Sequence, residues 1–96
     1  MELLLLITNP EAGPIAGGLA GASHRAGIDW AVFLTNDGVK ILADDTVAAA
    51  LQKARRAIVC QDSWAMYMPG HRCPLELGSQ TNNSALVSQA AHVVSL

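Results

Sequence analysis

Two cysteines, Cys60 and Cys73, are the side chains whose type best fits a chemical function. A thiolate is a nucleophile, and a helix N-terminus favours it because free N–H groups place partial positive charge beside the sulfur. Cys60 follows the apolar residues 57–59 and precedes Gln-Asp-Ser at 61–63. This pattern is typical of a buried strand that turns into a helix. The sequence therefore predicts a thiol at a strand–helix junction.

The polar residues after Cys60 are candidates for a binding role beside the thiol. Ser63 carries a hydroxyl that can donate to the sulfur, and either Ser63 or Asp62 can cap the helix that begins there. We expect Asp62 to cap the helix or face solvent, since its carboxylate would oppose a thiolate. Gln61 and Ser63 are predicted to bind ligand next to Cys60.

Two asparagines stand where earlier strands are expected to end. Asn9 follows the apolar run at 2–8, and Asn36 follows a second run at 28–35. The carboxyl ends of parallel strands share one edge of a sheet, and ligands bind in the crevice outside that edge. We therefore predict that Asn9 and Asn36 line a small pocket with Cys60.

Cys73 lies in a loop bounded by Pro69-Gly70 and Pro74. If this loop folds back over Cys60, Cys73 can act as a resolving thiol that forms a disulfide with Cys60 and releases transferred sulfur. A two-cysteine redox protein would need the two Cα atoms within roughly 7 Å of each other. The simpler interpretation, a loop cysteine with no partner, is the one we favour.

A metal centre is an alternative use of the same soft ligands. Cys60, His71 and Cys73, together with His24, would supply the side chains. Their spacing matches no standard zinc motif, and the four ligands would have to converge from separate loops. We therefore expect no metal and no other cofactor.

Strand and helix patterns alternate along the chain. The expected strands are 2–8, 28–35, 57–60, 75–77 and 92–96, with a further extended segment at 39–42, and the expected helices are 14–26, 46–54, 64–68 and 84–91. This alternation predicts an α/β fold with a parallel or mostly parallel sheet of about five strands and right-handed crossovers.

The composition bears on partners. Of the 96 residues, 51% are hydrophobic and 15% are charged, whereas average domains carry about 25% charged residues. The apolar excess in one small domain predicts burial in a subunit interface, and hence a homo-oligomer. The formal charge of −2 and the scattered Lys and Arg residues argue against nucleic-acid binding, which needs a clustered positive surface.

The N-terminal run bears on location. Residues 1–7 are apolar but too few to span a bilayer. They lack a positively charged start, and Asn-Pro-Glu at 9–11 interrupts the run, so we expect no signal peptide and no membrane partner. The expected location is the cytoplasm, where a pair of cysteines is more often chemical than structural.

Four short stretches together resemble a known family. They are the strand and turn at 58–63, the Gly-Ser turn at 78–79 with the helix after it, the last strand at 91–96, and the second strand and its turn at 33–39. In these stretches the sequence resembles the DsrE/DsrF-like sulfur-relay proteins. The resemblance implies a single domain over 1–96 with a flavodoxin-like three-layer sandwich. It also implies assembly into dimers, trimers or hexamers.

The same resemblance implies a cysteine that carries sulfur as a persulfide between partner proteins, a role that falls on Cys60 alone. The sulfur-carrier members have an Ala-rich helix with Arg and Gly soon after that cysteine, whereas here the first arginine is Arg72. Two functions remain open. One is a sulfur carrier or sulfurtransferase subunit that uses Cys60 and meets a donor and an acceptor protein. The other is a non-catalytic oligomeric interaction or small-ligand-binding module in which Cys60 is structural.

Overall fold

The computed structural model describes residues 1–96 and contains one sheet of five parallel strands. Across the sheet the strands follow the order β4-β3-β2-β1-β5. The strands are β1 (Leu3–Ile7), β2 (Trp30–Leu34), β3 (Arg56–Cys60), β4 (Glu76–Gly78) and β5 (His92–Ser95). This arrangement confirms the predicted α/β fold and is consistent with a flavodoxin-like three-layer sandwich.

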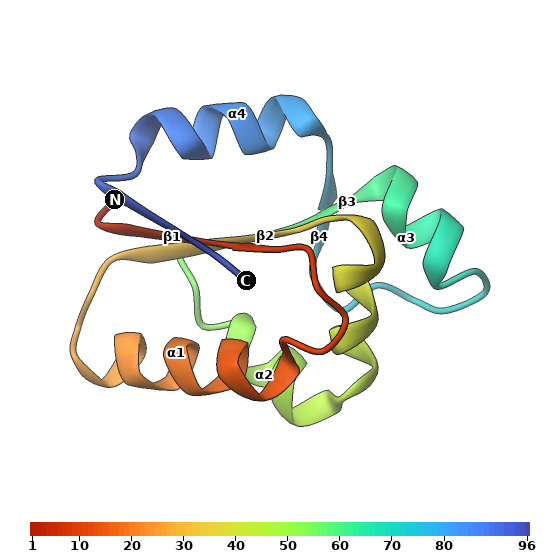
Figure 1. Cartoon of the computed structure of the whole chain (residues 1–96), viewed down its shortest axis with the longest axis horizontal. Helices are drawn as coiled ribbons and strands as arrows, with labels where there is room; N and C mark the ends of the chain where they lie inside the picture. The colour runs from red at the N-terminus through yellow and green to blue at the C-terminus, as the bar shows by residue number, and fades with distance from the viewer.

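Helices cover both faces of the sheet. They are α1 (Gly13–Arg25), α2 (Asp45–Leu51), α3 (Gln61–Tyr67) and α4 (Gln80–Gln89), and a 3-10 helix, η1, covers Asn36–Ala43. Figure 1 shows α1 and α2 on one face, α4 alone on the opposite face, and α3 beyond the end of β3. None of these helices is long and apolar enough to cross a membrane.

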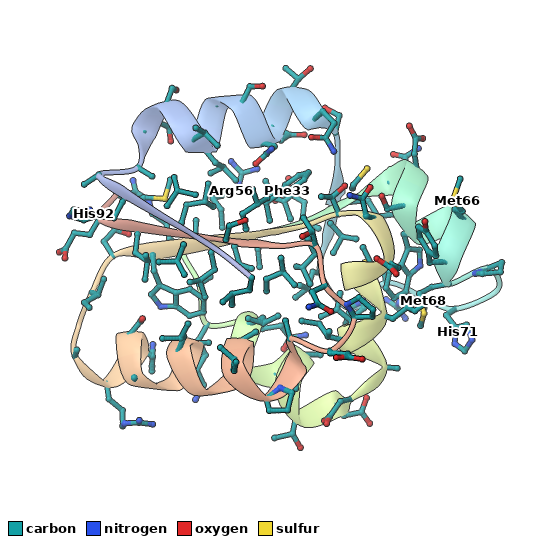
Figure 2. All side chains as sticks on the ribbon, viewed as in Figure 1. Phe33, Arg56, Met66, Met68, His71 and His92 are labelled. Carbon is teal, nitrogen blue, oxygen red and sulfur yellow. The ribbon has the colours of Figure 1, made fainter.

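The central strands are apolar without interruption because the sheet is covered on both sides. Every residue of β2 is buried. Phe33 points toward α4, while its neighbours Val32 and Leu34 belong to the core on the other face (Figure 2). Because successive side chains of a strand point to opposite faces, β2 contributes to two separate cores.

The two cores are unequal. The core between the sheet and the α1, η1 and α2 side has 16 buried residues, whereas the core on the α4 side has 6. Helix α4 contributes one buried residue to it, Leu86. The α4 face is therefore the more thinly covered one, and Leu6 of the interior strand β1 is only partly buried there.

The prediction of an extended segment at 39–42 is wrong, because these residues lie within η1. Asn36 opens η1 with a left-handed φ of 54°. Gly38 then passes so close to the end of β1 that a Cβ atom there would lie 2.8 Å from the Ile7 carbonyl oxygen. This close approach curls the segment over the sheet, so its apolar side chains enter the larger core from a helix.

Both helices near the carboxyl ends of β3 and β4 begin earlier than predicted. Cys60 itself occupies the N-cap position of α3, so neither Asp62 nor Ser63 caps that helix. Helix α4 is capped by Ser79, whose backbone N–H donates to Asn82 Oδ1 at 2.8 Å. The early starts bring the first turns of both helices to one edge of the sheet.

Candidate functional site

A pocket of about 540 Å³ lies where β3 and β4 end. Its walls are residues 60–62, at the start of α3, and residues 78–82, at the start of α4. This is the carboxyl edge of a parallel sheet, which is where open α/β folds bind ligands. Cys60 supplies the thiol of this wall and is 7% exposed.

The surroundings of Cys60 favour its thiolate. Burial raises the pKa of the thiol, but hydrogen bonds from the Ser63 hydroxyl and backbone N–H, the Thr35 hydroxyl and the Asp62 backbone N–H outweigh burial, so that the pKa lies below its ordinary value. Hydrogen bonds to the charged form of a group stabilise that form. Donors from two segments of the chain therefore favour the thiolate form of Cys60.

The two hydroxyls are oriented by donors of their own. Ser63 Oγ accepts a hydrogen bond from the Asn36 backbone N–H at 2.9 Å and lies 3.3 Å from Thr35 Oγ1. The side-chain amide of Gln80 donates to Thr35 Oγ1 at 3.1 Å. Each hydroxyl thus receives a hydrogen bond from outside and keeps its own hydrogen to donate, either to Cys60 or to the other hydroxyl. Both Ser63 and Thr35 are buried.

Gly78 sets the distance between α4 and β3. A Cβ atom at this position would lie 2.6 Å from both Asn82 Oδ1 and Ile58 Cγ2. These are separations that real Cβ atoms essentially never show, so a side chain here would push the start of α4 outward. The missing side chain lets Gln80 reach Thr35 beside Cys60.

The structure separates the binding residues that the sequence predicted. Cys60 and Gln61 lie on the pocket wall. Ser63 lies behind the wall and reaches Cys60, and Asn36 contributes its backbone N–H to Ser63. Asn9 instead accepts a hydrogen bond from the Glu11 backbone N–H at 2.9 Å, within its own turn, and does not line this pocket.

Two residues of the site, Thr35 and Gln80, were not predicted from the sequence. Thr35 was included in a strand, and Gln80 was assigned to the turn before the last helix. The Gln80–Thr35 hydrogen bond joins residues 45 positions apart. The one available signal was the position of Thr35 at a strand end, directly before Asn36.

Cys73 lies in a different environment. It packs against the larger core, whereas Cys60 belongs to the core on the α4 side. The indole N–H of Trp64 donates to the His71 carbonyl oxygen at 2.8 Å and holds the Cys73 loop on that side. Figure 2 shows Met68 and His71 of this region on the side of the sheet where α2 lies. Neither cysteine forms a disulfide.

The pKa of the Cys73 thiol is also shifted in the direction opposite to that of Cys60. Burial raises its pKa, and a hydrogen bond from the Leu75 backbone N–H offsets only part of that effect. The role of Cys73 as a resolving thiol stays a prediction, and the fold offers no support for it.

The alternative metal site does not assemble. No group of three His, Cys, Asp or Glu side chains comes together in a way that could hold a metal ion. Cys60, His71, Cys73 and His24 are therefore not brought together as ligands. The reason is visible in the fold, because Cys60 and Cys73 pack against different cores.

A larger hollow of about 620 Å³ lies between α1, η1 and α2. Its walls carry Lys40, Glu11 and Asp44 but no cysteine, histidine or serine. Size alone would favour this hollow, but a nucleophile with a lowered pKa is the better indicator of a chemical site. The candidate site is therefore the smaller pocket beside Cys60.

The fold and the site define a small parallel α/β protein with one thiol, at the carboxyl edge of its sheet, whose pKa lies below its ordinary value. No protein-family model matches the sequence, and no curated protein matches it either. The likeness to DsrE/DsrF-like proteins consequently rests on the short stretches described above.

Proposed function

We propose that this protein carries sulfur as a persulfide on Cys60. The observation that supports the proposal is the convergence of hydroxyl and backbone donors on the Cys60 sulfur at the wall of an open pocket. A carrier needs a nucleophilic thiolate that a partner can reach, and it needs fixed dipoles that stabilise the anion. The resemblance to sulfur-relay proteins points to the same residue.

The transfer needs no redox co-reactant. The Cys60 thiolate attacks the outer sulfur of a donor persulfide, R–S–SH. The S–S bond of the donor breaks, R–S⁻ leaves and is protonated by solvent, and Cys60 becomes a persulfide. In the second half of the cycle an acceptor thiolate attacks the outer sulfur on Cys60, and the Cys60 thiolate is the leaving group.

The donors around Cys60 act in both halves of this cycle. A thiol with a lowered pKa is present as thiolate at a lower pH, and it is also the better leaving group. The outer sulfur of the persulfide would lie in the pocket beside Gln61. Donor and acceptor proteins are the proposed partners, and a cytoplasmic location fits because thiols stay reduced there.

A specific observation favours a second candidate. Cys60 is only 7% exposed, and a buried cysteine is often a small apolar residue of the core. In that case the protein is a non-catalytic oligomeric or ligand-binding module. The two functions differ in whether a small persulfide can react with Cys60 in the folded protein.

The deciding measurement is the intact mass of the reduced protein after exposure to a low-molecular-weight persulfide. We expect the wild type and Cys73→Ser to gain one sulfur atom and Cys60→Ser to gain none. Cys60→Ser, which retains Cys73, controls for adducts elsewhere. No adduct on the wild type would overturn the carrier proposal and leave Cys60 as a structural residue.

A further inference from the structure

The two edges of the sheet are protected to different degrees. Edge strands invite pairing with another chain unless they are short, charged, interrupted by proline or covered. Strand β4 is three residues long, and its Glu76 pairs with Arg56 at 2.9 Å. Strand β5 has no Pro, Lys, Arg, Asp or Glu and is exposed along its whole length.

The outer side of β5 carries free backbone groups. The N–H groups of His92 and Leu96 donate inward to the carbonyl oxygens of Glu2 and Leu6, at 2.9 and 2.8 Å. Backbone groups alternate in direction along a strand. The N–H and C=O groups of Val93 and Ser95 therefore point away from β1, where no strand pairs with them.

We propose that β5 pairs antiparallel with β5 of a second copy of this chain, about a two-fold axis at Val94. In this register Val93 lies opposite the partner's Ser95, and each such pair exchanges both of its hydrogen bonds. Val94 then faces the partner's Val94 as a non-hydrogen-bonded pair, with Cα atoms about 4.5 Å apart. One register satisfies all the free groups of Val93 and Ser95.

The chemistry of the strand fits a second copy of itself. The facing pairs are valine with valine, valine with serine, and His92 with the partner's Leu96, so no like charges meet across the axis. Like charges directly opposite each other would destabilise such a pair. A two-fold axis also matches each edge to itself, which is the property of the commonest dimers.

The side chains around β5 also gain burial. Val93 is 44% exposed on the α4 face, and Val94 is 37% exposed on the other face. On the same face, Leu6 lies beside Ser95 and remains partly exposed because α4 covers this face thinly. A partner strand would cover apolar side chains on both faces of the sheet, as the apolar composition of the chain led us to expect.

The dimer leaves the thiol sites open. In the strand order β4-β3-β2-β1-β5, β3 is separated from the paired edge by two strands. The pockets of the two copies would lie near the two outermost strands of one continuous sheet. Because the strands of the two copies run in opposite directions, the two pockets would open on opposite sides of that sheet, each where the strands of its own copy end. Pairing through β5 therefore does not depend on the proposed sulfur chemistry, and either proposal can fail alone.

Disulfide trapping tests the register. In a Cys60→Ser, Cys73→Ser background, we expect Val94→Cys to form a covalent dimer rapidly under mild oxidation, because about 4.5 Å between Cα atoms suits a disulfide. Val93→Cys should react more slowly, since identical positions one residue off the axis face each other diagonally at roughly 7–8 Å. Leu77→Cys, on the opposite edge at 45% exposure, is the matched control. Trapping of Val94→Cys no faster than Leu77→Cys would overturn the register.

Sedimentation velocity tests the association without cross-linking. We expect the wild type to dimerise as its concentration rises from low micromolar to near-millimolar. Val94→Lys should be monomeric because it sets two lysines face to face, whereas Leu77→Lys should behave like the wild type. Ser95→Pro removes an outward N–H without removing a bond to β1 and should also weaken the dimer. A monomeric wild type, or a dimer that survives Val94→Lys, would overturn the proposal.

Discussion

Cys60 and Cys73 lie on opposite faces of the same sheet, and burial raises the pKa of both thiols. At Cys60, donors from Ser63, Thr35 and Asp62 outweigh burial, and the pKa falls below its ordinary value. At Cys73 the single backbone donor does not outweigh burial, and the pKa stays above its ordinary value. The donors around a buried thiol therefore decide whether that thiol is suited to chemistry.

The largest expected effect follows from the contact that keeps α4 close to Cys60. Gly78→Ala places a Cβ atom against Ile58 and Asn82 and should destabilise the protein by about 1–3 kcal/mol in urea unfolding. Because the start of α4 carries Gln80, its movement should also weaken the Gln80–Thr35 hydrogen bond and raise the pKa of Cys60 slightly. Gly18→Ala is the control, since a Cβ atom there meets nothing within 4 Å. Equal stability of the two variants would contradict this account of Gly78.

The next effect removes one hydroxyl donor. Ser63→Ala should raise the pKa of Cys60 and slow its alkylation near neutral pH several-fold, because the thiolate loses a hydrogen bond. It should also cost about 1–2 kcal/mol, since the Asn36 N–H loses its acceptor. Alkylation rate against pH measures the first change, with the exposed Ser88→Ala as control. An unmoved alkylation midpoint would remove Ser63 from the site.

A smaller effect is expected one bond further from the sulfur. Gln80→Leu removes the donor to Thr35 but leaves every hydrogen bond to Cys60 in place. We expect a rise in the pKa of Cys60 in the same direction as for Ser63→Ala, but smaller, and a loss of stability below about 1 kcal/mol. Gln89→Leu, at the other end of α4, is the matched control. A shift larger than that of Ser63→Ala would mean that Gln80 acts on Cys60 directly.

Much of the fold could be predicted from the sequence because burial on both faces leaves continuous apolar runs. The predicted strand 57–60 matches β3 to within a residue, and 92–96 contains β5. Prediction failed where tertiary contacts override local pattern. The 39–42 segment is helical because Gly38 packs on the end of β1. The start of α4 was missed because polar residues begin it, and its cap, Ser79, looked like part of a turn.

The site could be predicted only in part. A strand that ends in cysteine and opens a helix placed Cys60 at the carboxyl edge of the sheet, as the structure has it. The donors to Cys60 are Thr35, directly after β2, and Asp62 and Ser63 in α3. Gln80 reaches Thr35 from across the pocket. No local pattern links these segments. For the same reason, the sequence could not predict that Cys73 lies away from Cys60, because this depends on the path of the loop after α3.

The smallest expected effect is the opposite response of stability to pH at the two thiols. The pKa of Cys60 is lower in the folded than in the unfolded chain, so its contribution is complete above the unfolded pKa and is lost as pH falls through the folded pKa. The pKa of Cys73 is higher, so its contribution is complete below the unfolded pKa and is lost as pH rises through the folded one. Urea unfolding under reducing conditions, from about pH 6 to pH 9 around a free-thiol pKa of about 8.5, measures both. The destabilisation by Cys60→Ala should grow with pH, and that by Cys73→Ala should shrink. Trends of the same sign would contradict the contrast between the two cysteines, because the donors at Cys60 would then not outweigh its burial.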